Sequence, residues 1–103
     1  MFNSRIVGMG HYVPENVVTN DDLSKFMDTS DSWIQERTGV KERRWAEPNT
    51  GNTTSEMGVK AAKIAIENAT IDKHEIDFII FATLSPDYYF PGPGVLAQKM
   101  LGL

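Results

Sequence analysis

Trp33 and Arg37 combine a flat aromatic surface with a fixed positive fork, four residues apart in the chain. On a helix, this spacing puts both side chains on the same side. A purine base can stack on the indole while the guanidinium reaches a phosphate, and this combination binds nucleotides well. The alternative is an ordinary cation–π or core-edge contact between the two side chains, which the spacing alone favours.

A second candidate site is the proline-bounded loop Asp87-Tyr88-Tyr89-Phe90-Pro91, which carries three aromatic side chains. It follows directly after an apolar run, and α/β proteins place ligands in the loops at strand ends. Tyr and Phe are also enriched at contacts between subunits. Ligand contact and interface anchor are both open interpretations of this loop, and the two roles are compatible.

The glycine and histidine motifs have simpler structural explanations. Gly8-Met9-Gly10 resembles the start of a dinucleotide-binding motif, but the third glycine is missing, so a turn that needs small residues is the favoured interpretation. His11 and His74 lack the carboxylate or second histidine at helical spacing that a metal site would need. No metal site is therefore predicted.

Composition narrows the possible functions. The net charge of -4 argues against a general nucleic-acid binder, because such affinity comes mostly from clustered Lys and Arg. The chain has no cysteine, so a disulfide, a thiolate metal site and a cysteine nucleophile are all excluded within its 103 residues. The N-terminus does not resemble a signal peptide, and the longest apolar run, Phe78 to Leu84, is too short to cross a bilayer. A cytoplasmic location is expected.

The elements that carry the first site are predicted from local signals. Asn20 is expected to cap a short helix through Phe26. Thr29 or Ser30 is expected to cap a second helix through about Arg37, with Gly39 as its left-handed stop. Strands are predicted for Arg5 to Tyr12, Val17 to Thr19 and Val40 to Trp45.

The second half of the chain has the clearest helix. Thr53-Thr54-Ser55-Glu56 has the spacing of a capping box and begins a helix with a small-residue apolar face. Phe78 to Leu84 reads as a strand buried on both faces, and Val95 to Leu101 as a helix that Gly102 ends. This order predicts an α/β protein with parallel pairing, in one continuous unit without an internal linker.

Several motifs in order resemble the ketoacyl synthase III family. The resemblance covers essentially the whole chain, and its most specific part is Thr29 to Arg43. The matching motifs are Gly8-x-Gly10-x-Tyr12-x-Pro14, Val17-Val18-Thr19-Asn20-Asp21-Asp22-Leu23, Thr29-Ser30-Asp31-Ser32-Trp33-Ile34, Arg37-Thr38-Gly39-Val40-Lys41-Glu42-Arg43, Ile79-Ile80-Phe81-Ala82-Thr83 and Met100-Leu101-Gly102-Leu103.

The resemblance implies the N-terminal part of a thiolase-like, layered αβαβα fold built from duplicated halves. Such enzymes act as homodimers, move a short acyl group from coenzyme A to a cysteine, and condense it with malonyl-acyl carrier protein while losing carbon dioxide. The implied partners are acyl-CoA and acyl carrier protein, without nucleic acid or membrane. No tightly bound cofactor is implied, because the coenzyme A thioester is a substrate.

Four residues acquire expected roles from the resemblance. Trp33 matches the tryptophan that stacks on the adenine of coenzyme A, Arg37 the arginine at its phosphate region, and Thr29 a residue beside the adenine. This reverses the preference that spacing alone gave. Phe90 matches the loop aromatic that crosses the dimer interface and limits the partner's acyl pocket. The Tyr88-Tyr89 pair departs from commoner patterns and leaves the preferred acyl group open.

The family would continue after Leu103 into the catalytic cysteine, and later into a histidine and an asparagine. No catalytic residue is therefore predicted in this chain, and the isolated chain is expected to catalyse no condensation. Two alternatives are a related synthase of secondary metabolism, which would use the same fold with another donor or acceptor, and a short non-catalytic module that binds coenzyme A or a partner.

Overall fold

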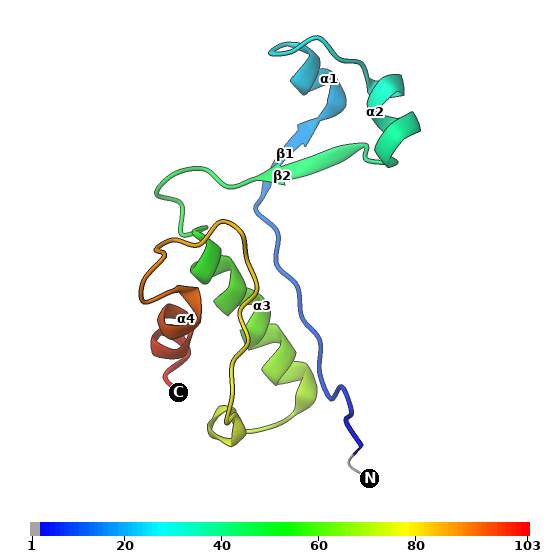
Figure 1. Cartoon of the computed structure of the whole chain (residues 1–103). Helices are drawn as coiled ribbons and strands as arrows, with labels where there is room; N and C mark the ends of the chain where they lie inside the picture. The colour runs from blue at the N-terminus through cyan, green and yellow to red at the C-terminus, as the bar shows by residue number, and fades with distance from the viewer. Residues whose placement is uncertain (1–2) are drawn as a thin grey trace. The chain divides into compact units, whose positions relative to one another are not determined.

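A computed structural model describes residues 3–103, and the chain forms two compact units (Figure 1). The hairpin unit comprises Val13–Glu47, and the helical unit comprises the residues up to Tyr12 together with Pro48–Leu103. The expectation that the chain belongs to one domain without an internal linker stays a prediction. No helix in the described part of the chain is long and apolar enough to cross a membrane.

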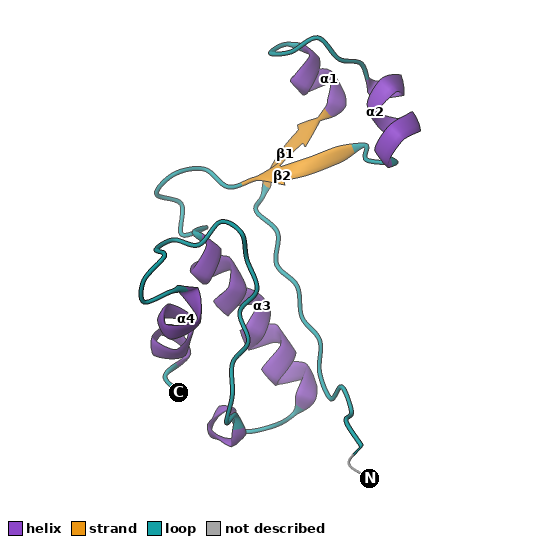
Figure 2. Ribbon diagram, in the orientation of Figure 1, coloured by secondary structure: helices purple, strands orange, loops and turns teal. Residues whose placement is uncertain are grey.

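The hairpin unit is built on two short antiparallel strands, shown in orange in Figure 2. Strand β1 (Asn16–Thr19) pairs with β2 (Glu42–Trp45) in a register that sets Asn16 opposite Trp45 and Thr19 opposite Glu42. These strands confirm the predictions for 17–19 and 40–45, with bounds that differ by one or two residues. The predicted parallel pairing is wrong for the described residues, where this antiparallel pair is the sheet.

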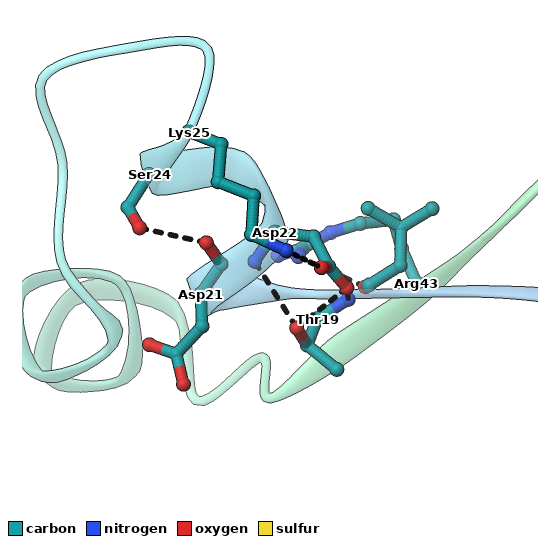
Figure 3. Close-up of polar contacts among 7 residues, drawn as sticks. Thr19, Asp21, Asp22, Ser24, Lys25 and Arg43 are labelled. Carbon is teal, nitrogen blue, oxygen red and sulfur yellow. Dashed lines mark hydrogen bonds and ion pairs between the residues drawn. The ribbon is translucent and has the colours of Figure 1, made fainter.

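Helix α1 (Asn20–Ser24) is capped by Thr19 rather than by Asn20, and it ends before Phe26. The Thr19 Oγ1 accepts a hydrogen bond from the Asp22 amide at 3.1 Å, and the Asp22 carboxylate accepts one from the Thr19 amide at 3.0 Å, which completes a capping box (Figure 3). The predicted cap is wrong because the Asn20 side chain points into the interior, where it is 1% exposed.

A lysine strengthens this cap. The Lys25 Nζ donates to Asp22 Oδ1 at 2.8 Å, and this bond, followed by those from Thr19, holds the pKa of Asp22 well below its ordinary value of 3.8. A carboxyl whose pKa is lowered by folding stabilises the folded state above its unfolded pKa. The contribution is lost only as the pH falls through the lowered pKa, so the cap is complete at neutral pH.

Helix α2 (Asp31–Thr38) begins and ends as predicted. The Ser30 Oγ accepts from the Trp33 amide at 3.2 Å, which satisfies one of the free donors of the first turn. Gly39 takes the left-handed conformation at φ 71°, and its amide donates to the Gln35 carbonyl at 2.8 Å. Within α2, which is described in full, Ile34 is the buried residue.

The helical unit packs α3 (Thr54–Ala69) against α4 (Pro93–Leu101), with a short 3₁₀ turn, η1 (Lys73–Glu75), between them in the chain. The capping box of Thr53 and Glu56 and the stop at Gly102 confirm the predicted helices, although α4 begins two residues earlier than expected. The core of the helical unit consists of Val59, Ala97 and Leu101, with Ala62, Ile66, Phe81 and Leu103 packed against them.

The second face of α3 lies against the extended N-terminal segment. A Cβ added at Gly10 would lie 2.6 Å from the Ala65 amide nitrogen, so the glycine allows the two backbones to approach. The Asn68 Nδ2 also donates to the Met9 carbonyl at 2.8 Å. The predicted turn at Gly8-Met9-Gly10 is therefore wrong, because these glycines serve close packing of an extended segment on a helix.

The segments 5–12 and 78–84 are extended but form no strand among the described residues, contrary to prediction. Phe78 is 80% exposed and Ile80 84% exposed, whereas Ile79 and Phe81 on the other face are partly buried. Burial on both faces is therefore wrong for the described residues. A strand needs a neighbouring strand that hydrogen-bonds with its backbone groups, and the described residues place none beside 78–84. They also cover only one of its two faces.

Candidate functional site

Trp33 and Arg37 lie together on the outer side of α2. The guanidinium carbon of Arg37 is 4.5 Å from the centre of the Trp33 ring, and 51% of Trp33 remains exposed. This confirms that a four-residue spacing brings the two side chains to one side of the helix. The cation–π contact orders both groups while leaving a large part of the indole and the guanidinium open to solvent.

Thr29 precedes the N-cap of α2 and adds a hydroxyl to the same region of the chain. Its Oγ1 is buried and has no hydrogen-bond partner among residues 3–103. A buried hydroxyl without a partner is unusual in a folded protein, because its desolvation is not compensated. Thr29 lies four residues before Trp33 in the chain, and its hydroxyl oxygen is closed to solvent.

The first turn of α2 carries a carboxylate that is held by two amide side chains. The Asn20 Nδ2 donates to Asp31 Oδ1 at 2.8 Å, and the Gln35 Nε2 donates to Asp31 Oδ2 at 2.6 Å. These bonds, with that from Asn20 the larger cause, lower the pKa of Asp31 from its ordinary value. Asp31 is therefore ionised at neutral pH and serves as an anchor of α2 rather than as an acid or base.

Asn20 and Asp31 are site-forming residues that the sequence analysis missed. The helix-start signal at Asn20 indicates a local cap, which Thr19 forms instead. The actual partners of its side chain are 11, 20 and 23 residues away in the chain. No local spacing rule covers such separations, so composition and periodicity carried no signal for this contact.

The aromatic loop belongs to the helical unit, and its base is fixed to the start of α3. The Asp87 carboxylate accepts hydrogen bonds from the Ser55 amide at 3.0 Å and from the Ser55 hydroxyl. The Thr54 hydroxyl donates to the Ser85 carbonyl at 2.6 Å. Tyr89 and Phe90 are 93% and 91% exposed. The loop thus presents two large aromatic side chains from an anchored base.

The predicted site residues fall into two groups. Thr29, Trp33 and Arg37 lie on or directly before α2 in the hairpin unit, and Phe90 lies in the loop of the helical unit. Within residues 3–103, no group of three or more His, Cys, Asp or Glu is arranged to hold a metal ion. The chemistry available on α2 is recognition of a flat, anionic ligand by stacking and charge.

No protein-family model matches the chain. It is 51% identical over 102 residues to the beta-ketoacyl-[acyl-carrier-protein] synthase III of Ehrlichia canis, a match that covers 99% of this chain and 31% of that protein. It is 50% identical over 102 residues to the enzyme of that name from Clostridium acetobutylicum, covering 99% of this chain and 30% of the relative. The chain thus spans about a third of the length of these relatives.

Solved structures agree with the sequence relatives. The 3-oxoacyl-[acyl-carrier-protein] synthase III of Aquifex aeolicus superposes with a TM-score of 0.90 at 46% identity, covering 97% of this chain and 32% of that one. The priming beta-ketosynthase of the R1128 polyketide pathway gives a TM-score of 0.87 at 36% identity, covering 95% and 29%. The thiolase-like α/β fold expected from the sequence is confirmed.

Proposed function

Because this chain belongs to the beta-ketoacyl-[acyl-carrier-protein] synthase III family, we propose that it is the N-terminal part of a condensing acyltransferase that starts fatty-acid synthesis. In the whole protein, a cysteine thiolate attacks the acyl-CoA thioester and releases coenzyme A. Malonyl-acyl carrier protein then loses carbon dioxide, and its carbanion attacks the acyl-enzyme to form the ketoacyl product and free the cysteine. Cysteine is absent from this chain, so that nucleophile lies in other residues.

The contribution of this chain is recognition of the coenzyme A nucleotide by α2. The observation that carries this proposal is the exposed Trp33 ring with the Arg37 guanidinium 4.5 Å from its centre. Adenine stacks on the indole, the guanidinium contacts the phosphate region, and Thr29 lies beside the adenine. The coenzyme is a substrate here, and no tightly bound cofactor is proposed.

Phe90 is proposed to act on the acyl group rather than on the nucleotide. Its side chain is almost fully exposed on a loop whose base is anchored by Asp87 and Ser55, which suits a residue that enters a neighbouring subunit. The proposed assembly is a homodimer in which Phe90 limits the length of the partner's acyl pocket. The homodimer is a prediction from the family relation, and the cytoplasmic location is a prediction from the sequence.

A related synthase of secondary metabolism is the second candidate function. The likeness to the R1128 priming beta-ketosynthase, at 36% identity and a TM-score of 0.87, favours it specifically. The two functions share the nucleotide-binding helix and differ in the acyl donor or the carrier protein.

A condensation assay tests the proposed function. The whole protein, supplied with acetyl-CoA and malonyl-acyl carrier protein, is expected to form ketoacyl-acyl carrier protein and to release one carbon dioxide for each free coenzyme A. Residues 1–103 alone are expected to give no turnover, because they hold no nucleophilic cysteine. Failure of the whole protein to condense any short acyl-CoA with malonyl-acyl carrier protein would contradict the proposal, and turnover by the isolated chain would contradict the assignment of catalysis elsewhere.

Replacing Phe90 with alanine is expected to broaden the range of accepted acyl chains. Removal of the ring opens the end of the pocket, so kcat/KM for acyl-CoA two carbons longer than the preferred one should rise about tenfold relative to the preferred one. Tyr89→Ala is the matched control, since Tyr89 is equally exposed in the same loop. An unchanged chain-length profile for Phe90→Ala, or an equal change in both variants, would remove Phe90 from the pocket.

A further inference from the structure

Asn20 is a buried polar side chain at the start of α1, in the hairpin unit. It is 1% exposed, and all its hydrogen-bonding groups are used. Its Nδ2 donates to Asp31 Oδ1 and to the Val40 carbonyl, both at 2.8 Å, while its Oδ1 accepts from the Arg43 guanidinium at 2.6 Å. Figure 3 places Arg43 beside the first turn of α1. A carboxamide with three satisfied, buried bonds fixes the groups around it.

These bonds reach both ends of α2. Asp31 is the first residue of the helix, and Val40 follows the glycine that ends it. The third partner, Arg43, also donates to the Val18 carbonyl at 3.2 Å and so ties the carboxamide to both strands of the hairpin. One side chain therefore sets the position of the helix ends relative to the two-stranded sheet.

Helix α2 makes few apolar packing contacts with the rest of the hairpin unit. Ile34 is its buried residue, whereas Trp33 and Arg37 point outward. The placement of the helix then depends strongly on the polar bonds at its ends. We propose that Asn20 is a positioning residue for coenzyme A, whose bonds to Asp31 and Val40 hold the Trp33–Arg37 surface where the nucleotide binds. This inference rests on the proposed function and adds a residue that does not touch the ligand.

The chemistry requires an amide at position 20. A carboxamide donates to two acceptors and accepts from one donor, as the site demands. An aspartate at this place would set a second carboxylate against Asp31 and would offer no donor to the Val40 carbonyl. Like charges so close repel, and the buried carbonyl would lose its partner.

The test compares two ligands in the whole protein with Asn20→Asp. Coenzyme A carries the nucleotide, and pantetheine lacks it. We expect the Kd for coenzyme A to rise about tenfold, because displacement of α2 misplaces the stacking ring, while the Kd for pantetheine stays unchanged. The midpoint of thermal unfolding, measured in parallel, reports whether the variant is folded.

Two further variants separate positioning from a general effect of charge. Asn16→Asp is the matched control, because the exposed Asn16 Nδ2 donates to a Glu47 carboxylate at 3.0 Å in the same unit but away from α2. This variant should leave both dissociation constants unchanged. The double variant Asn20→Asp with Asp31→Asn restores an amide-to-carboxylate bond in the reverse direction. It should recover part of the affinity for coenzyme A, because the Val40 carbonyl still lacks its donor.

A loss of affinity for coenzyme A but not for pantetheine in Asn20→Asp, with recovery in the double variant, supports the proposal. If a folded Asn20→Asp protein loses affinity equally for both ligands, or loses affinity for neither, the proposal is overturned. If this variant does not fold, Arg43→Met decides, because it removes one bond to the carboxamide and should raise the Kd for coenzyme A about threefold. Unchanged affinity would then overturn the proposal. Failure of the proposed function itself is distinguishable, since Trp33→Ala would then also leave the coenzyme A affinity unchanged.

Discussion

Replacing Trp33 with alanine is expected to weaken coenzyme A binding by the whole protein by about 1–3 kcal/mol, or about 5- to 150-fold in Kd. The loss arises because the exposed indole, ordered by Arg37 at 4.5 Å, provides the stacking surface for adenine. Alanine at this exposed helical position removes that surface without opening a cavity in the core. Isothermal titration with coenzyme A measures the change directly.

Trp45→Ala is the matched control for this prediction. Trp45 is the second tryptophan of the chain, lies in the same unit on β2, and is 45% exposed against 51% for Trp33. Its removal should leave the affinity for coenzyme A unchanged. Equal losses for the two variants would indicate a general effect of aromatic loss on the hairpin unit, and an unchanged Kd for Trp33→Ala would take Trp33 out of the site.

Replacing Gly10 with alanine is expected to lower the free energy of unfolding by about 1–3 kcal/mol. The added methyl would lie 2.6 Å from the Ala65 amide nitrogen and 2.9 Å from Ile64 Cβ. Both atoms belong to α3, so neither can move without shifting the helix. Urea unfolding followed by circular dichroism gives the change in free energy.

Gly94→Ala provides the contrasting substitution in the same unit. A methyl at Gly94 would meet Phe81 Cβ at 3.7 Å, an ordinary contact, and Gly94 lies in α4. The change should leave stability unaltered or raise it by up to about 0.5–1 kcal/mol, because alanine loses less backbone freedom than glycine in a helix. Equal stability of Gly10→Ala and the unchanged protein would show that the N-terminal segment does not pack closely on α3.

The helices were predictable because their start and stop signals are local. Ser30, Thr53 and Gly102 act on atoms within four residues, and each does so in the structure as the sequence indicated. The Trp33–Arg37 contact was predictable for the same reason, since helical geometry alone joins residues four apart. The expected role of that pair required the family resemblance, because spacing alone favoured a simple contact.

The remaining features depend on contacts between distant residues. The apolar run 78–84 was expected to be buried on both faces, but Phe78 and Ile80 are exposed, because burial depends on what packs above the segment and not on its composition. The sequence predicts Asn20 as the cap of α1, but Thr19 forms that cap. The Asn20 side chain instead bonds Val40 and Arg43, which lie far away in the chain. Sequence patterns report local periodicity and cannot identify partners at such separations.

The central claim is that α2 binds the nucleotide part of coenzyme A, and a ligand-by-variant cycle tests it most directly. Dissociation constants are measured for coenzyme A and for pantetheine, which carry no acyl group to transfer, with the unchanged whole protein and with Trp33→Ala. We predict that the unchanged protein binds coenzyme A more tightly, and that Trp33→Ala removes about 1–3 kcal/mol of this difference while leaving pantetheine binding unaltered. An equal loss of binding free energy for both ligands, or no loss for either ligand, would contradict the claim.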